Sequence, residues 1–156
     1  MGSSYAISCK SCDYKKSFIT GIGMMYAPHN LTDFEADNPL LPSLIRSERS
    51  VDFIKALLAN KDAVIADSYS HEIYRCPKCG EFYGRFFIQL DYYDGGSFEV
   101  EYKCPKCKVA LKPIEYDAFD DDVCEDKRIS LEKYPCRPKC GKHSLFEGGE
   151  AYVLWN

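Results

Sequence analysis

Apolar and polar residues alternate along two stretches in the middle of the chain. Every second residue is apolar from Phe86 to Tyr92, and again from Phe98 to Tyr102. A period of two predicts β-strands that bury one face. The segment DYYDGGS joins the two stretches, and its Gly-Gly pair is typical of a tight turn. The pattern therefore predicts an antiparallel hairpin.

A helical spacing is clear in one place, residues 50–60. Apolar side chains recur there three and four positions apart, at Val51, Ile54, Leu57 and Leu58. This spacing predicts one amphipathic helix whose apolar face packs on the sheet. Ser50 is the expected N-cap, and Asn60 suits the C-terminal end. A shorter helical turn is expected over residues 41–47, within a cysteine-free helical insertion at 27–62 between the first two cysteine pairs.

The chain is large enough for one compact domain over residues 1–156, because 46% of its residues are hydrophobic and only 28% are charged. It has no apolar run of the length that a membrane-spanning helix needs, and its first residues lack the apolar stretch of a secretory signal. We therefore expect a cytoplasmic protein that does not associate with a membrane.

Cysteine is over-represented, with nine residues. Eight of them form close pairs: Cys9 and Cys12, Cys76 and Cys79, Cys104 and Cys107, Cys136 and Cys140. Disulfides do not persist in a reducing cytosol, so clustered cysteines are expected to bind metal. The ninth, Cys124, stands alone between carboxylates and is expected to be a small apolar residue and a poor nucleophile.

The two central pairs flank the predicted hairpin. A tetrahedral zinc ion takes four ligands, which proteins supply as two tight pairs of cysteines. Proline follows the first cysteine of each CPKC motif, and Gly80 permits the positive φ that such a knuckle needs. The segments YRCPKCGEFYGRFF and EVEYKCPKCKVAL resemble the zinc-ribbon and rubredoxin-like superfamily over about a quarter of the chain. The resemblance implies a zinc ribbon over residues 72–114 and says little about function.

The outer pairs, CKSC near the start and CRPKC near the end, are less regular, yet their gaps still allow one metal to be bound. Joining them requires the two ends of the chain to meet, with terminal strands pairing. Two other arrangements compete: first pair with second and third with fourth, or an interleaved cross-brace. The inner ribbon is favoured because its hairpin signals are the clearest. The predicted fold is a small α+β domain with zinc-ribbon hairpins around two four-cysteine sites.

Two structural Zn²⁺ ions are the expected cofactors. Thioredoxin-type pairs would start a helix after a strand, which neither CPKC motif does. Iron uses the same four thiolates and remains the less favoured metal. His29, His71 and His143 are scattered. His71 is expected to be a surface or half-buried residue rather than one that supports a ligand, and His143 is a weak substitute ligand. The glycine-containing GIGMMY is expected to be a turn beside the first knuckle.

The charge pattern bears on the partner. The formal net charge is −4, yet most of the 20 basic residues lie near a cysteine pair. A zinc ion with four thiolates carries about two negative charges, so charge compensation explains this placement better than nucleic-acid binding does. The acidic segment DAFDDDVCED is expected to be a solvated loop.

No enzyme signature appears, and a four-thiolate site has no open position for catalysis. Tyr and Phe are plentiful, with 12 and 9 residues, and aromatic side chains are favoured at interfaces. The sequence therefore favours a non-catalytic zinc-binding protein whose surface binds another protein. The alternatives are a nucleic-acid-associated accessory factor, disfavoured by the net acidity, and a rubredoxin-like iron protein for electron transfer or redox sensing.

Overall fold

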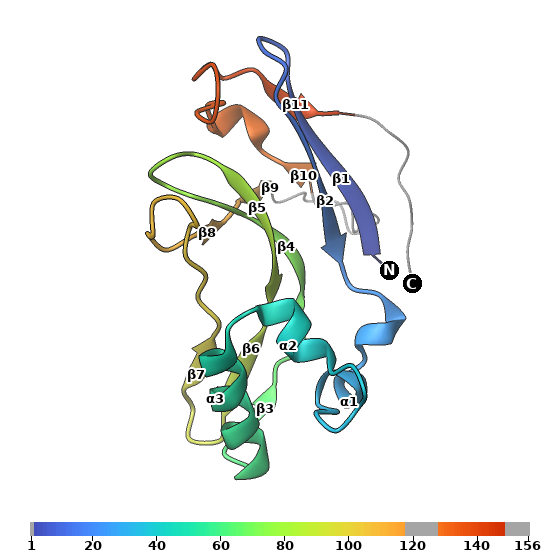
Figure 1. Ribbon diagram of the computed structural model, residues 1–156. Helices are drawn as coiled ribbons and strands as arrows, with labels where there is room; N and C mark the ends of the chain where they lie inside the picture. The colour runs from blue at the N-terminus through green and yellow to red at the C-terminus, as the bar shows by residue number, and fades with distance from the viewer. Residues whose placement is uncertain (1, 118–127, 149–156) are drawn as a thin grey trace.

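The computed structural model describes residues 2–117 and 128–148, and its strands form one larger sheet and two small ones. Strand β1 (Gly2–Cys9) pairs antiparallel with β2 (Lys15–Gly21) on one side and with β11 (Leu145–Glu147) on the other. The N-terminal hairpin and the C-terminal strand therefore lie side by side at the top of Figure 1. The pairing of terminal strands that joining the outer cysteines requires is present.

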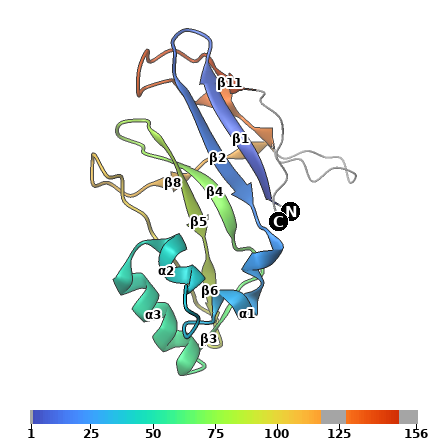
Figure 2. The ribbon, with the colours of Figure 1, turned by 45° about the vertical axis from the view of Figure 1, so that its right-hand side comes forward.

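The larger sheet continues through a second hairpin, made of β4 (Ser70–Arg75) and β5 (Phe82–Phe87). Strand β2 reaches β4 near the start of β4, and the short β8 (Lys112–Pro113) pairs with the far end of β4. The order is β11-β1-β2-β4-β5, with β8 added on β4. Strand β4 thus connects the N-terminal hairpin with the segment that contains β8, as Figures 1 and 2 show.

The predicted central hairpin is present, in three pieces. The first alternating stretch divides at Ile88 between β5 and β6 (Gln89–Tyr92), and the second forms β7 (Ser97–Glu99) and then leaves the sheet. Strands β6 and β7 pair across the Gly-Gly turn, and β3 (Ala63–Ile65) completes a three-stranded sheet. Burial keeps its period of two beyond the strands because Val100 still donates its N–H to the carbonyl of Ile88 (3.4 Å).

The remaining elements are short. Two further strands, β9 and β10, pair with each other, and single 3-10 turns lie after β2 and before the last cysteine pair. Their bounds are Met24–Tyr26 (η1), Tyr116–Asp117 (β9), Arg128–Ile129 (β10) and Leu131–Lys133 (η2).

The helices lie together in the lower half of Figure 1, all between the first two cysteine pairs. They are α1 (Pro28–Leu31), α2 (Leu40–Ile45) and α3 (Glu48–Ala59). Helix α2 matches the short helical turn expected from the sequence, whereas α1 carried no signal that we recognised. In α3, Val51 and Ile54 are buried, and Leu57 and Leu58 are half-buried, as the helical spacing predicts.

The predicted N-cap of α3 was wrong by about one turn. Ser47 caps the helix, and its side-chain oxygen accepts the backbone N–H of Ser50 (3.4 Å). Arg46 ends α2 in the left-handed conformation (φ 58°), so the chain turns sharply and α3 starts directly afterwards. The turn at Arg46 places Ser47 where its side chain can cap the helix, so α3 begins at Glu48, before the start expected from Ser50.

The core consists of two clusters that meet at β4. Ile73 and Tyr74 are neighbours on this strand, and because successive strand residues point to opposite faces, they enter different clusters. One cluster joins the helices to β6 and β7 and contains Cys76 and Cys104. The other joins β1 and β2 to the C-terminal segment; it contains Cys9 and Cys136. Each cluster therefore surrounds one pair of buried cysteines.

The segment GIGMMY was expected beside the first knuckle. Gly21 instead ends β2 at the opposite end of the strand from Cys12, so that expectation was wrong.

Within residues 2–117 and 128–148, no helix has the length and apolar character that crossing a bilayer would require.

Candidate metal centres

The structure gathers the eight paired cysteines into two groups of four. Each group brings its sulfur atoms within 4.8 Å of one another: Cys76, Cys79, Cys104 and Cys107 in the inner group, Cys9, Cys12, Cys136 and Cys140 in the outer group. The second pair thus meets the third and the first meets the fourth, which is the favoured inner-ribbon arrangement. All eight are free thiols.

The inner group lies between the tip of the β4–β5 hairpin and the loop before β8, which are side by side in Figures 1 and 2. The first turn is closed where Cys76 donates its N–H to the carbonyl of Glu81 (2.9 Å). Gly80, at φ +75°, donates back to the carbonyl of Cys76 (2.9 Å). The positive φ expected at Gly80 is confirmed, and it lets the chain reverse directly after the second cysteine.

The second turn of the inner group repeats this geometry without glycine. Cys104 donates its N–H to the carbonyl of Val109 (2.8 Å), and Lys108 adopts φ 61° and donates to the carbonyl of Cys104 (2.9 Å). In addition, the N–H of Cys107 points at the sulfur of Cys104 (3.5 Å), as the N–H of Cys79 does at its own partner's sulfur (3.4 Å). Backbone amides aimed at sulfur favour the thiolate form.

The outer group depends on the meeting of the chain ends. Cys9 closes β1 opposite Leu145 of β11, and Lys10 donates its N–H to the carbonyl of Ser144 (2.9 Å). The extra residue in CRPKC is accommodated because Gly141, at φ +71°, carries the reversal and donates to the carbonyl of Cys136 (2.7 Å). The longer gap therefore forms the same kind of turn.

The sulfur spacing suits a tetrahedral ion. An ion with bonds of about 2.3 Å to four sulfurs places those sulfurs about 3.8 Å apart. The Cys79–Cys104 sulfurs are 3.8 Å apart, those of Cys12 and Cys136 3.7 Å, and those of Cys9 and Cys140 3.6 Å. Both groups could therefore hold a metal ion, and the donor set suits zinc or iron.

The thiols of each group differ in acidity. Burial raises the pKa of Cys79 to about 12, and burial likewise raises the pKa of Cys136 to about 12. Burial also acts to raise the pKa of Cys104, but the Cys107 amide and the Tyr83 hydroxyl lower it to about 6. In the outer group, burial acts to raise the pKa of Cys9. The Ser11 amide and the neighbouring thiols outweigh this effect and lower that pKa to about 7.

One sulfur of each group thus ionises readily, and it opposes ionisation of a neighbour: Cys104 helps to raise the pKa of Cys79, and Cys9 that of Cys136. A divalent cation at the centre would remove that opposition, because it favours all four thiolates at once.

Tyr83 and Arg75 lie beside the inner group. The Tyr83 hydroxyl is 3.6 Å from the sulfur of Cys104, and Lys16 and Arg85 lie over its ring (4.8 and 5.1 Å). The guanidinium of Arg75 lies 5.1 Å from the Tyr134 ring. Burial and the neighbouring Arg137 lower the pKa of Arg75, and the opposite effect of the Cys76 and Cys79 sulfurs does not cancel this shift. These cations are placed to balance thiolate charge.

Residues that flank the two groups contact each other. Tyr14 accepts the N–H of Cys9 at its carbonyl, and its hydroxyl donates to a carboxylate oxygen of Glu81 (2.7 Å), the residue that closes the inner turn. Lys16 donates to the carbonyl of Phe82 (2.6 Å) and lies 3.5 Å from the same Glu81 oxygen. Sequence reasoning missed this link. A signal existed, because Tyr14 and Glu81 each stand two positions after the second cysteine of their pair.

The histidines lie apart from the sulfur groups, which contain cysteines alone among the described residues. His71 is half-buried in β4, with its ring 5.1 Å from Phe86 and 5.2 Å from Tyr26. His143 is exposed, and its Nδ1 lies 2.9 Å from the carbonyl oxygen of Glu132. Cys124 and most of the acidic segment DAFDDDVCED fall outside the described residues.

No known protein family matches this chain, and neither does any curated protein or solved structure. The likeness to zinc ribbons therefore depends on the cysteine geometry itself.

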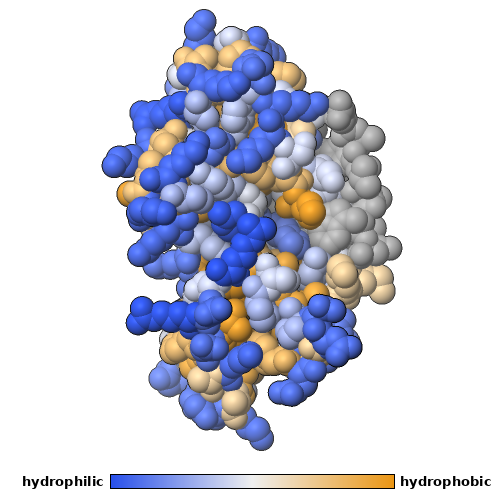
Figure 3. All heavy atoms as spheres, viewed as in Figure 1, coloured by the Kyte–Doolittle hydropathy of each residue, from blue (hydrophilic) through white to orange (hydrophobic). Residues whose placement is uncertain are grey.

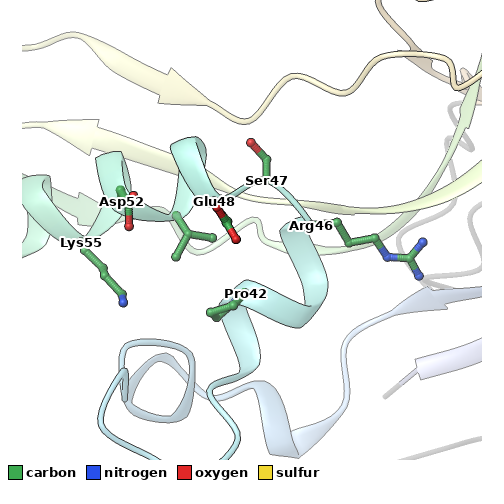
Figure 4. Close-up of a pocket in the computed structure, with 7 residues that line it drawn as sticks. Pro42, Arg46, Ser47, Glu48, Asp52 and Lys55 are labelled. Atoms are coloured by element: carbon green, nitrogen blue, oxygen red, sulfur yellow. The ribbon is translucent and has the colours of Figure 1, made fainter.

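Two hollows open on the helical half of the surface. One, of about 410 Å³, is lined by Arg49, Ser50, Phe53 and Phe98. The other, of about 400 Å³, lies between α2 and α3 and is lined by charged and small residues; Figure 4 shows Arg46 directed away from Lys55. Among the described residues that line these hollows there is no cysteine and no histidine.

Proposed function

We propose that this chain is a non-catalytic zinc-binding protein, with two structural Zn²⁺ ions, that presents a surface to another protein. The observation that carries the metal assignment is the spacing of 3.6 to 3.8 Å between sulfurs from different cysteine pairs, which suits tetrahedral coordination. Half of the eight sulfurs belong to buried residues inside the two core clusters, so bound ions would sit within the core itself.

A structural role follows from the ligand count. Four cysteine ligands fill a tetrahedron and leave no position for water or substrate, which catalytic zinc sites retain. A structural zinc ion contributes roughly 10 kcal/mol or more to folding at neutral pH. That contribution matters here because the helical and strand elements are short, and each core cluster is small.

The helical end of the molecule offers the proposed partner surface. Many of the aromatic residues lie in the core, among them Phe18, Phe82 and Phe86, so aromatic abundance alone does not indicate an interface. Phe53 is different: it remains 43% exposed, packs edge-on against Phe98 (4.8 Å) and lines a hollow. Figure 3 shows a mainly hydrophilic face on which hydrophobic groups occur in small patches. An aromatic side chain in such a setting is typical of a binding hot spot.

Elemental analysis of freshly purified, reduced protein tests the metal assignment. We expect two zinc equivalents, a colourless solution, and loss of tertiary structure when a chelator removes the ions. Visible absorption from iron–thiolate bonds would instead support the rubredoxin-like alternative. Metal-free protein that keeps its fold would overturn both.

Affinity capture from the native host tests the partner proposal. The protein captured by the wild-type chain should be lost with Phe53→Ser and retained with Met24→Ser, a matched control because Met24 is 81% exposed on η1. Binding to single-stranded DNA or RNA at low salt that weakens steeply as salt rises would favour the nucleic-acid alternative instead.

A further inference from the structure

We propose that the two cysteine sites are coupled, so that a metal ion in one raises the affinity of the other, and that the Tyr14–Glu81 hydrogen bond carries much of this coupling. The inference rests on the proposed metal binding and adds a property that two separate zinc ribbons would lack.

Each partner in this hydrogen bond is part of a knuckle backbone. The carbonyl of Tyr14 accepts the N–H of Cys9, and the carbonyl of Glu81 accepts the N–H of Cys76. These two bonds position the first cysteine of each turn. The Tyr14 hydroxyl then joins the two residues through their side chains (2.7 Å). An ion that orders either turn therefore also positions one of the two residues, Tyr14 or Glu81, that form this hydrogen bond.

A second arm runs parallel to the first. Lys16 lies near the start of β2, shortly after the outer turn. It donates to the carbonyl of Phe82, just after the inner turn (2.6 Å), and lies 3.5 Å from the Glu81 carboxylate. Phe82 is fully buried and belongs to the cluster that surrounds the outer cysteines, although its chain continues directly from the inner turn. The inner turn thus supplies part of the core of the outer site.

The two turns also meet where the backbone of Gly80 faces the side chain of Arg137. A methyl group built on Gly80 would lie only 2.5 Å from the Cβ of Arg137, which stands between Cys136 and Cys140. So close an approach means that displacement of one turn displaces the other. Because binding free energies are reciprocal, an ion that orders either turn must favour ordering of its neighbour by the same factor.

The magnitude follows from the contacts. A buried hydrogen bond to a charged group is typically worth a factor of about ten or more in an equilibrium constant. We therefore expect zinc in one site to strengthen binding at the other about tenfold.

Native mass spectrometry at limiting zinc, buffered by a competing chelator, measures this coupling. The wild-type chain should show mainly zinc-free and two-zinc molecules, and Tyr14→Phe should raise the one-zinc fraction. That substitution keeps the buried ring and the carbonyl that accepts from Cys9. Tyr93→Phe, at a side chain 70% exposed, should leave the distribution unchanged. Equal one-zinc fractions in the wild type and Tyr14→Phe would overturn the proposal.

A site-resolved measurement excludes a simple weakening of the outer site. Cys140→Ser should lower zinc affinity at the inner site about tenfold in the wild-type background and much less in the Tyr14→Phe background. If Tyr14→Phe does not fold, Lys16→Met probes the other arm without altering the buried ring. Two zinc ions bound independently would refute the coupling alone, whereas no zinc bound at all would refute the proposed function.

Discussion

The backbone of Gly80 lies directly against the side chain of Arg137, and this contact joins the turn of the second cysteine pair to that of the fourth. A Cβ on Gly80 would come within 2.5 Å of the Cβ of Arg137 and 3.1 Å of a guanidinium nitrogen of Arg75. Gly141 occupies the corresponding place in the fourth pair, with a similar φ of +71°, yet a Cβ there would meet nothing within 4 Å. Both glycines therefore adopt a positive φ, and only Gly80 also needs the absence of a side chain.

Alanine at these glycines separates the two requirements. Gly141→Ala should lower the free energy of unfolding by about 1 to 2 kcal/mol, because alanine resists the positive φ. Gly80→Ala should cost about 1 to 3 kcal/mol more, because its methyl group also forces the two turns apart. Denaturant unfolding of the zinc-loaded variants measures both. Equal losses would show that the turns do not press on each other.

Tyr83→Phe should weaken metal binding at the inner site. The Tyr83 hydroxyl lies 3.6 Å from the sulfur of Cys104, and a donor to a ligating sulfur stabilises the thiolate. Its loss should lower zinc affinity at that site roughly tenfold, with little change at the outer site. Chelator competition measures the affinities, with Tyr93→Phe as the control. A drop in both sites alike would point to general destabilisation.

Ser47→Ala should destabilise the protein by about 1 kcal/mol, because the N-cap of α3 loses its side-chain acceptor. Ser50→Ala should cost less, since it keeps the backbone N–H that Ser47 accepts and removes only the hydroxyl that accepts from the Ser47 hydroxyl (3.1 Å). Thermal unfolding of the zinc-loaded variants compares them. The reverse ranking would restore Ser50 as the cap.

His71 should make stability depend on pH. Burial against Phe86 and Tyr26 lowers its pKa below the usual 6.5, and the neighbouring Glu72 only partly offsets this. The unfolded imidazole therefore takes up a proton at a higher pH than the folded one. Stability should be full above about pH 6.5, and it should be lost progressively as the pH falls toward the pKa of the folded state.

An NMR titration of the imidazole in zinc-loaded protein reads this pKa directly, with His71→Phe to assign the resonance. The same variant should reduce the loss of stability on acidification. A titration midpoint for His71 at or above 6.5 would contradict its burial.

The sequence predicted the elements that depend on neighbouring residues. The central hairpin, the helix over α3 and the positive φ at Gly80 all follow from periodicity or from glycine in a short motif. The same reasoning misplaced the cap of α3, because the left-handed Arg46 that brings α2 so close to it carries no composition signal. It also placed GIGMMY beside the first knuckle, because it did not recognise β2, the strand that carries the chain away from that knuckle.

The spacing of the cysteines was enough to indicate which eight could bind metal, because two- and three-residue gaps restrict where a pair of sulfurs can lie. The folded chain brings Cys9 to Cys140 and Tyr14 to Glu81, across separations of 131 and 67 positions that the spacing within a motif does not cover. Those contacts depend on the pairing of β1 with β11 and of β2 with β4. Strand pairing between distant segments is set by burial of the whole core, which no short stretch of the chain specifies.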